Sequence, residues 1–432
     1  MQKISFPIHP AIFEGFMVVA LYNAVIFILR QLFKLAAFHN SKAMLFNHGR
    51  KDFFSAFSTA LHNQTQPVIW MHCASLGEFE QGRPVLEALK KEYPSYKILV
   101  TFFSPSGYEV RKNYPHADYI FYLPWDTPQN ARKFIEISRP VLALFVKYEF
   151  WYHYISALHQ NNIPLLCISG AFRKEQVFFR WYGGFFRKML HRFTHFFVQN
   201  DSSVELLRSI GIQQVTRSGD TRFDRVWQLT QQQEALTTVE LFKSRDKVMV
   251  IGSCWPEDLE VLMPFINDQY PRTKFIIAPH EISEELLSRI ERELPGRSVR
   301  YSIASQMNNP EKYPILIIDN IGMLARLYRY GEYAWVGGAF GKGLHNILEP
   351  ACFGMPVFFG NKNYRKFPEA LDLINRGGAF AIADYPHLKA TFEAVNDPGT
   401  YMLACEVTRQ YVEENRGATT KIMDYCTKLL SK

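Results

Sequence analysis

The chain has 432 residues, of which 47% are hydrophobic and 21% charged, and its formal net charge is +8. These values exclude a disordered or low-complexity chain and favour two domains of roughly 200 residues each. The positive charge indicates anionic partners, a class that includes phosphorylated ligands, acidic membrane surfaces and nucleic acid. The six cysteines contain no CxxC pair. They therefore predict neither a zinc site nor a disulfide framework, and a reducing cytosolic compartment fits best.

Residues 11–29 form an almost wholly apolar run. A helix of this length could just cross a hydrocarbon core about 30 Å thick, although Glu14 and Asn23 interrupt the apolar composition. The cations that follow the run are Arg30, Lys34, Lys42, Arg50 and Lys51. By the positive-inside rule they would keep the bulk of the chain on the cytoplasmic side. Residues 1–38 therefore predict a membrane anchor that spans the bilayer or lies in its interface, and a buried core helix is the alternative.

Between Pro67 and Asn200, apolar segments alternate with segments of helical period. The expected strands are residues 67–72, 97–103, 118–123, 141–146, 163–169 and 195–200. Because these segments lack a polar alternation, they predict a parallel sheet that is buried on both faces. Such sheets bind ligands at the carboxyl ends of their strands. Glu78 follows the first of these strands and Glu149 follows the fourth.

Each of these two acids has a structural and a functional explanation. Ser75 and Glu78 have the S-x-x-E spacing of a capping box, which by itself would account for the glutamate. Glu149 could complement the dipole of a following helix. Their shared position at strand ends of one sheet favours a catalytic role for both.

Residues 173–193 predict an amphipathic helix with arginines on one side and aromatic residues on the other. Such a helix could lie on an anionic bilayer, where Arg180 and Arg187 would meet acceptor phosphates or anionic headgroups, or it could pack on the sheet. The pair Gly183-Gly184 indicates a break or bend. Further along, residues 218–224 predict a loop that presents Arg222, and the polar run 228–240 predicts the domain boundary, which we place at residues 232 and 233.

The second half of the chain repeats the alternating pattern. The expected strands are residues 247–253, 274–279, 315–319, 333–336 and 357–360. Their ends, at Ser253, His280, Gly322 and Asn346, would open toward one edge of a sheet. Residues 401–430 predict one long helix that crosses toward the first domain. We expect the domains to be residues 39–232 and 233–400, followed by this helix over 401–432.

The stretch after residue 336 combines a glycine turn with a helix start. Asn346 can cap a helix that carries Glu349 in its first turn, so loop amides and a positive helix end would converge on a spot suited to phosphate. An ordinary strand-to-helix turn is the alternative. Neither GxxxxGK[ST] nor GxGxxG is present, which disfavours kinases, helicases and dehydrogenases. No acidic metal cluster is evident, so a leaving group would be stabilised by this helix start, His280 and Arg222.

Four segments together resemble one known family. They are ASLGEFEQGRPV at 74–85, KYEFW at 147–151, SGDTRFD at 218–224, and VGGAFGKGLHNILEPACFGMPVFFG at 336–360. In this order they resemble the 3-deoxy-D-manno-octulosonic acid (Kdo) transferases of lipopolysaccharide biosynthesis, over about residue 15 to the C-terminus. The resemblance implies an α/β fold of GT-B type, with two Rossmann-like domains facing a central cleft. It also implies inverting transfer of Kdo from CMP-Kdo to a lipid A precursor at the cytoplasmic face of the inner membrane.

The family's functional positions carry over motif by motif. Glu78 corresponds to the general base, while Glu149 and Arg222 correspond to transition-state stabilisers, with Arg222 in place of a lysine. The positions expected to bind the CMP-sugar are Ser253, Pro279, His280, Ile321, Gly322, Met323, Asn346, Ile347, Leu348 and Glu349. The resemblance implies neither a metal site nor a cofactor. The chain departs from the family pattern at Lys147, His280 and Met323.

Two other functions are compatible with parts of the sequence. A GT-B transferase or epimerase that uses a UDP-sugar would share the glycine loop and Glu349, but the hydrophobic N-terminus weighs against a soluble epimerase. A nucleic-acid-binding protein would explain the net charge, but no RNA-binding signature is present. We therefore expect CMP-Kdo, a lipid A precursor and the anionic inner-membrane surface as partners, and no nucleic acid. The sequence predicts no oligomeric state.

Overall fold

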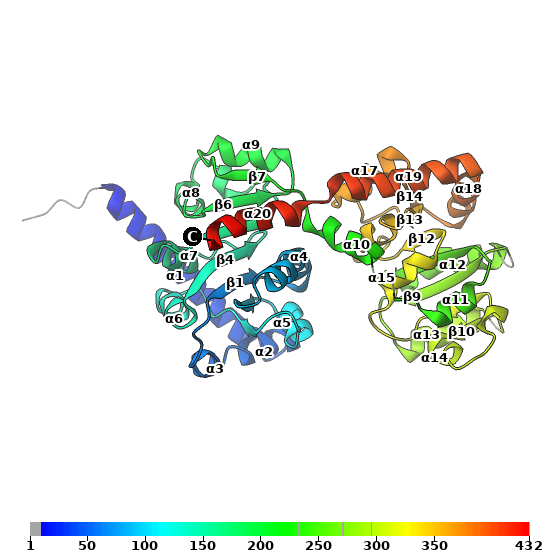
Figure 1. The fold of residues 1–432 in the computed structure, drawn as a ribbon, viewed down its shortest axis with the longest axis horizontal. Coiled ribbons are helices and arrows are strands. Elements are labelled where there is room, and N and C mark those ends of the chain that lie inside the picture. Colours follow the sequence, from blue (N-terminus) through cyan, green and yellow to red (C-terminus); the bar gives the residue numbers. More distant parts are fainter. Residues whose placement is uncertain (1–9, 232–233, 270–271, 295, 432) are drawn as a thin grey trace, which may run out of the picture. The chain divides into compact units, whose positions relative to one another are not determined.

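The computed structural model describes residues 10–231, 234–269, 272–294 and 296–431 (Figure 1). The chain folds as two compact units: unit 1 comprises Met1–Asp224 and Gly417–Lys432, and unit 2 comprises Arg225–Arg416. The boundary expected at residues 232 and 233 lies outside the described residues. The two units divide within helix α10, Thr221–Gln231.

Within the described residues, unit 1 contains a seven-stranded sheet in the order β3-β2-β1-β4-β5-β6-β7, and all of its paired strands are parallel. The strands are β1 Val68–Cys73, β2 Lys97–Phe102, β3 Tyr119–Tyr122, β4 Pro140–Val146, β5 Leu165–Gly170, β6 His195–Val198 and β7 Val215–Arg217. The six expected strands are confirmed. The sequence did not predict β7, which has only three residues.

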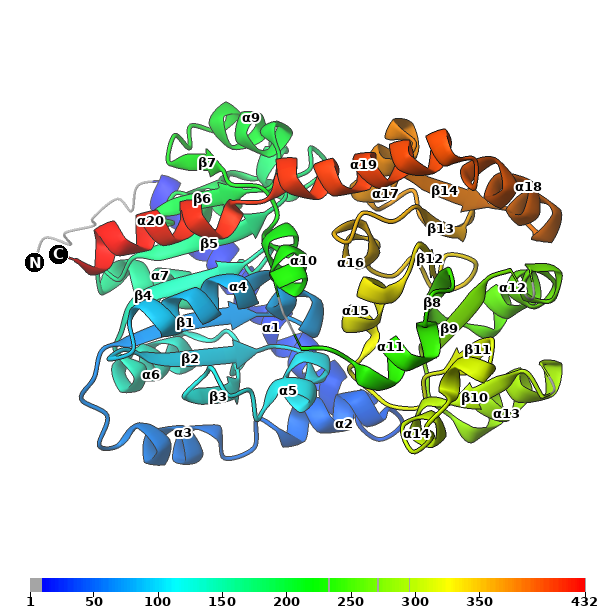
Figure 2. The same ribbon diagram turned by 45° about the vertical axis from the view of Figure 1, so that its right-hand side comes forward.

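Helices cover both faces of this sheet, as its apolar strands require. The helical segments are α1 Pro10–Ala36, α2 Ser41–His48, α3 Phe53–Leu61, α4 Leu76–Glu92, α5 Pro105–Arg111, α6 Pro128–Ser138, α7 Tyr152–Gln160, η1 Val177–Phe179, α8 Gly184–Leu190, α9 Asp201–Ser209 and α20 Ala418–Leu430. Along β1, Ile69 and Met71 pack toward α4 and α20, while Val68 and Trp70 pack toward α3, α6 and α7. Figure 2 shows α4 and α20 on the same face of the sheet.

Unit 2 has a second parallel sheet of seven described strands, in the order β10-β11-β9-β8-β12-β13-β14. The strands are β8 Val248–Cys254, β9 Lys274–Pro279, β10 Ser298–Arg300, β11 Ile315–Ile317, β12 Tyr333–Val336, β13 Val357–Gly360 and β14 Ala379–Ile382. The five strands expected here are confirmed, and the short edge strands β10 and β14 were not predicted.

The helical segments of unit 2 are α11 Thr237–Lys243, α12 Pro256–Gln269, α13 Glu284–Glu293, α14 Tyr301–Ala304, η2 Pro310–Lys312, α15 Leu324–Leu327, η3 Tyr328–Tyr330, α16 Leu348–Ala351, α17 Pro368–Arg376, α18 Tyr385–Val395 and α19 Pro398–Asn415. Two parallel sheets flanked by helices confirm the predicted α/β class.

The prediction of one helix over residues 401–430 is wrong. The segment forms α19 and α20, which are separated at Arg416 and Gly417. Gly417 has φ 103°, a left-handed conformation that glycine adopts at little cost. Its N–H donates to the Asp224 carboxylate over 2.5 Å, so the break is fixed by a hydrogen bond within unit 1.

The prediction of one amphipathic helix over residues 173–193 is also wrong. The described segment contains the short η1 and α8, joined by a turn at Gly183. A Cβ atom at Gly183 would lie 2.0 Å from the Val177 carbonyl oxygen, so the turn requires glycine. The Arg187 guanidinium donates to the carbonyls of Phe178 and Arg180. Arg187 therefore stabilises the turn, and the basic residues do not form one continuous stripe.

Helix α1 packs against the rest of unit 1 with one side. The Tyr22 hydroxyl donates to Asp126 over 2.5 Å, the Asn23 side chain lies 2.6 Å from His153 Nε2, and Phe33 lies against Phe46 with ring centroids 4.5 Å apart. Asn23, which interrupts the apolar run, thus faces protein. The large apolar side chains exposed on α1 are Met17, Val18, Leu21, Val25, Phe27, Ile28, Leu29, Leu32 and Leu35. Residues 17–36 are long and apolar enough to cross a membrane by length and composition.

Candidate functional site

Each sheet has one place where the chain reverses its direction of strand addition. In unit 1 the strands run outward from β1 to β3, and the chain then returns to place β4 on the other side of β1. In unit 2 the corresponding neighbours are β8 and β12. Loops diverge at such a switch point and leave a crevice at the carboxyl ends of the strands. Glu78 follows β1 and Glu149 follows β4, so both acids lie at the switch point of unit 1.

Glu78 lies in the first turn of α4, and its Oε2 accepts a hydrogen bond from the Ala74 N–H over 2.5 Å. The Ser75 side chain makes no capping hydrogen bond, and Glu78 accepts from the residue before the N-cap, so the expected reciprocal capping box is not formed. Burial and the nearby Glu149 charge raise the pKa of Glu78 to about 7, against the opposing effects of the Ala74 N–H and Lys147. A carboxyl group with this pKa can accept a proton near neutral pH.

Glu149 is buried and receives two hydrogen bonds on one oxygen. Its Oε2 lies 2.7 Å from Trp151 Nε1 and 3.0 Å from His72 Nε2. The other nitrogen of His72 lies 2.9 Å from Thr101 Oγ1, which in turn accepts from the Trp70 indole over 2.8 Å. His72 Nδ1 also lies 3.0 Å from the Thr101 carbonyl oxygen, so the ring is held between Thr101 and Glu149 through its two nitrogens. This network fixes the position of a carboxylate that is otherwise out of water.

Arg222 lies in the first turn of α10 and not in a loop as expected. Asp220 accepts from the backbone N–H of Arg222 and from its Nε, each over 2.9 Å. The same carboxylate also accepts hydrogen bonds from Gln199 Nε2 over 3.0 Å and from Gln81 Nε2 over 3.3 Å. Because Gln81 lies one turn after Glu78 on α4, these bonds tie the Arg222 helix to the helix that carries Glu78. The Arg222 guanidinium also pairs with Asp220 through Nη2 over 2.8 Å, and the Arg222 side chain keeps 31% of its surface exposed.

The switch point of unit 2 forms a cavity of about 300 Å³. Its lining includes Ser253 near the end of β8, Gly322 before α15, and Asn346 and Glu349 around the start of α16. The Asn346 side chain accepts from the Leu348 N–H over 3.2 Å and donates to Glu349 over 3.1 Å. Asn346 thus orders the first turn of the short helix α16.

The remaining donor-site residues lie around this cavity in different ways. Ile347 and Leu348 are buried in the unit 2 core, so only their backbones are available to a ligand. The Met323 side chain is 9% exposed, and its sulfur accepts from Asn320 Nδ2 over 2.8 Å. Ile321 is 91% exposed. The structure therefore brings Gly322, but neither the Met323 nor the Ile321 side chain, into the cavity lining.

A second cavity of about 350 Å³ adjoins the first through His345, and His280 after Pro279 lines it. Trp255 stacks on His280 with ring centroids 4.5 Å apart and donates from Nε1 to His345 Nε2 over 3.0 Å. The Lys342 ammonium lies 4.0 Å from the Trp255 ring centroid. Burial and the nearby His280 lower the pKa of His345 to about 4, so this ring is neutral at physiological pH.

Sequence reasoning missed His72, Trp151, Trp255 and His345. A signal existed for the first two, because His72 is a polar residue inside an otherwise apolar strand and Trp151 follows Glu149 in the KYEFW segment. Nothing in the spacing of Trp255 and His345 indicates that they meet, since 90 residues separate them.

Comparison with known proteins extends over most of the chain. A family model described as 3-Deoxy-D-manno-octulosonic-acid transferase (kdotransferase) matches residues 50–225. A 3-deoxy-D-manno-octulosonic acid transferase of Aquifex aeolicus is 27% identical over 318 residues, which is 72% of this chain and 81% of that protein. The protein of the same name from Haemophilus influenzae is 24% identical over 387 residues, or 84% of this chain and 87% of that protein.

Solved structures share the fold at low sequence identity. UDP-GlcNAc 2-epimerase from Neisseria meningitidis, solved with UDP-GlcNAc bound, is 16% identical with a TM-score of 0.60, over 84% of this chain and 100% of that one. MurG from Acinetobacter baumannii is 11% identical with a TM-score of 0.53, over 84% and 100%. These likenesses confirm the predicted GT-B type of architecture. The family model over residues 50–225 and these relatives make the chain similar to the 3-deoxy-D-manno-octulosonic acid transferases over most of its length.

Proposed function

We propose that the protein transfers Kdo from CMP-Kdo to a lipid A precursor, with inversion at the anomeric carbon. The observation that carries this proposal is the pair of carboxylates at the unit 1 switch point. Glu78 has its pKa raised to about 7, and the Glu149 carboxylate beside it is held by two hydrogen bonds. Two carboxyl groups in different environments can take different roles, one as a base and one as a fixed charge.

In this proposal the acceptor hydroxyl binds at Glu78. Glu78 accepts the hydroxyl proton as the oxygen attacks the anomeric carbon of Kdo, and the bond from that carbon to the CMP phosphate breaks. Positive charge that develops at the sugar ring is stabilised by Glu149. Negative charge on the departing phosphate is stabilised by Arg222, which Asp220 holds at the start of α10.

For the donor, we propose that the cavity lined by Ser253, Gly322, Asn346 and Glu349 binds the CMP portion. The backbone N–H groups at the start of α16 are suited to the single phosphate, and Glu349 is suited to ribose hydroxyls. We propose further that no metal ion or cofactor takes part, because Arg222 supplies the positive charge that the leaving phosphate needs. Activity is then expected to survive EDTA, and loss of turnover that a divalent ion restores would contradict this part of the mechanism.

We also propose that the protein acts at the cytoplasmic face of the inner membrane, with α1 lying in the interface. From Tyr22 to Phe33 one side of α1 contacts unit 1, while its other side exposes large apolar residues. A helix that packs on a folded unit along this length, roughly 17 Å at 1.5 Å per residue, is suited to insertion parallel to the surface.

The direct test combines the purified full-length protein, CMP-Kdo and a lipid A precursor in detergent. The expected results are release of CMP and an increase in the mass of the acceptor by one or more Kdo residues in mass spectrometry. Turnover of a UDP-sugar without any reaction of CMP-Kdo would refute the proposal in favour of another GT-B enzyme.

A further inference from the structure

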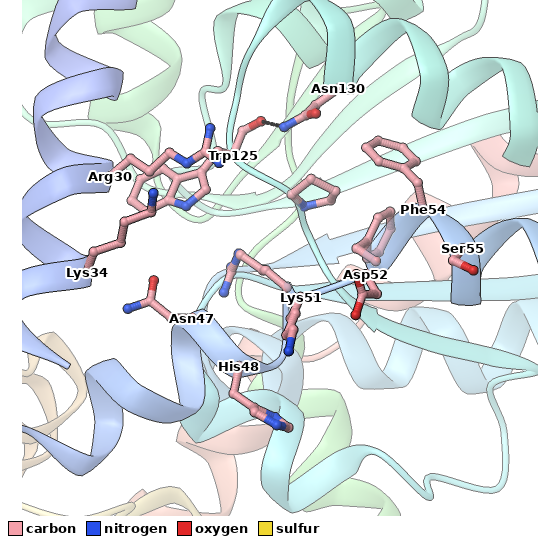
Figure 3. A pocket seen from close by; sticks show the side chains of 13 residues that line it. Arg30, Lys34, Asn47, His48, Lys51, Asp52, Phe54, Ser55, Trp125 and Asn130 are labelled. Atoms are coloured by element: carbon pink, nitrogen blue, oxygen red, sulfur yellow. Dashed lines mark hydrogen bonds between the residues drawn. The ribbon is translucent and has the colours of Figure 1, made fainter. Parts of the chain in front are cut away.

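A basic pocket of about 680 Å³ lies on unit 1 beside the apolar helix α1 (Figure 3). The side chains that define it here are Arg30, Lys34, His48, Lys51 and Trp125. Arg30 and Lys34 are one turn apart on α1 and extend from the same side of that helix in Figure 3. His48 ends α2, and Lys51 lies before α3. Three separate segments therefore bring cationic or titratable groups to one cavity.

The cations of this pocket have few partners. Among the described residues, no ion pair involves Arg30, Lys34 or Lys51, and Asp52 is the one acidic side chain in the lining. Arg50 also lines the pocket, but its guanidinium donates to the carbonyls of Phe46, Phe103 and Leu123. Like charges one helical turn apart destabilise a helix. Because Arg30, Lys34 and Lys51 are grouped without ion-pair partners among the described residues, the pocket is suited to a ligand that brings negative charge.

The pocket connects to the candidate active site through aromatic contacts within unit 1. The ring of Trp125 lies 5.9 Å from that of Phe103, which lies 4.7 Å from that of Trp151. Trp151 donates to Glu149. Aromatic packing thus links a wall of the pocket to the residue that holds Glu149.

An apolar groove of about 510 Å³ is lined by residues of the helices α1 and α2, which also contribute to the basic pocket. Its lining includes Leu29, Leu32 and Phe33 of α1, and Phe103 and Ser104 after β2. The Ser104 N–H donates to the carbonyl of Ala74, whose own N–H binds Glu78. The apolar groove thus ends beside a segment that contacts Glu78, and α1 and α2 line both this groove and the basic pocket. A lipid with a phosphate-bearing sugar headgroup combines the chemistry that these features would bind.

We propose that the basic pocket binds a phosphate group on the sugar headgroup of the acceptor lipid and that the adjoining groove holds one of its acyl chains. This inference rests on the proposed transfer to a glycolipid and assigns a subsite to its phosphate. It replaces Arg180 and Arg187 as the expected phosphate contacts, because Arg187 is engaged by carbonyls and Arg180 Nε lies 3.4 Å from the Glu175 carbonyl.

The test uses full-length enzyme in detergent micelles with two acceptors, a phosphorylated lipid A precursor and the same lipid after phosphatase treatment. The variant carries Arg30→Gln, Lys34→Gln and Lys51→Gln. The wild type is expected to show a KM about tenfold lower for the phosphorylated acceptor, and the variant is expected to lose this preference while its KM for CMP-Kdo stays within about twofold. The control variant carries Lys91→Gln, Arg132→Gln and Arg208→Gln, which removes three exposed cations of unit 1 and should keep the preference.

Several outcomes would overturn the inference. One is an unchanged preference in the variant, and another is an equal loss on both acceptors. A third is unchanged KM values in micelles with weaker sedimentation on phosphatidylglycerol vesicles, which would identify the pocket as a site for bulk anionic lipid. If the triple variant does not fold, Lys34→Gln alone should still reduce the preference. Failure of the proposed function is distinguishable, because the wild type itself would then release no CMP with either acceptor.

Discussion

The switch points of the two units use different means to prepare a site. In unit 1 the important groups are side chains, and Glu149 is held by hydrogen bonds from His72, which is buried, and from Trp151, which is partly buried. In unit 2 the lining relies on turns, with Gly322 at φ 93° and Asn346 ordering the start of a short helix. A group that carries charge in a reaction has to be fixed before the substrate arrives. A nucleotide cradle needs accessible backbone groups instead. Substitutions in unit 1 should therefore change turnover, and those in unit 2 should change donor affinity.

The largest effect is expected for Glu78→Gln. The amide oxygen can still accept the Ala74 N–H, but the side chain can no longer take the acceptor proton. Turnover should fall by about 10²-fold or more, while the affinity for CMP-Kdo remains near that of the wild type. CMP release under saturating substrates and donor binding by calorimetry measure the two quantities.

Ser75→Ala is the matched control for this variant. Ser75 makes no capping hydrogen bond in the structure, so its loss should change the free energy of unfolding by less than about 0.5 kcal/mol and leave turnover unchanged. A Glu78→Gln enzyme with full activity would refute the assignment of Glu78 as the base and make Glu149 the next candidate.

The pH dependence of the reaction is the next largest effect. Because burial and the charge of Glu149 raise the pKa of Glu78 to about 7, the basic form is lost as the pH falls below that value. kcat/KM should decrease about tenfold per pH unit below 7, and thus about 30-fold at pH 5.5. A profile that is flat between pH 5.5 and 7.5 would contradict this role.

The raised pKa of Glu78 also makes the stability of the fold depend on pH. Since the folded-state pKa lies above the ordinary value of 4.5, the stabilising contribution of the protonated group is present below about pH 4.5 and is lost as the pH rises through about 7. Glu78→Gln should remove this loss, so the difference in melting temperature between variant and wild type should grow in favour of the variant over this range.

Much of the fold follows from local patterns. The long apolar strands of both sheets were predicted because burial on two faces leaves an unbroken apolar run. The strands β7, β10 and β14 were not, because segments of three or four residues at or near a sheet edge carry too little pattern. The break at Gly417 was missed because a single glycine within a helical period is compatible with a continuous helix.

Residues of the candidate site could be predicted from the sequence only where they directly follow a recognisable strand. Glu78 and Glu149 were found because each follows an apolar strand. The hydrogen bond from His72 to Glu149 depends on the register that pairs β1 with β4, which a single sequence does not contain. For Met323 the position beside Gly322 predicts a ligand contact, whereas the side chain packs into the core, which the sequence did not indicate.

A smaller loss of turnover is expected for His72→Phe, because His72 positions Glu149 without touching the substrate. The change removes the Nε2–H that donates to Glu149 and leaves the Thr101 hydroxyl without its histidine partner. kcat should fall about tenfold with little change in KM, and the free energy of unfolding should fall by about 1–3 kcal/mol. His72→Gln retains a donor and should restore part of kcat. If both variants lose stability but keep the wild-type kcat, the network is purely structural.

The smallest effect compares two residues of unit 2 that the family resemblance treats alike. Asn346→Ala removes the acceptor for the Leu348 N–H and the donor to Glu349, so the start of α16 loses its order where a phosphate would bind. The dissociation constant for CMP should rise about fivefold, with kcat nearly unchanged.

Met323→Leu preserves the volume of a side chain in the core, so it should shift CMP affinity by less than about twofold and cost less than about 1.5 kcal/mol of stability. Calorimetric titration of both variants with CMP tests the pair. Equal losses of affinity would place Met323 at the ligand after all, and the contrast between a backbone cradle in unit 2 and a side-chain network in unit 1 would then no longer hold.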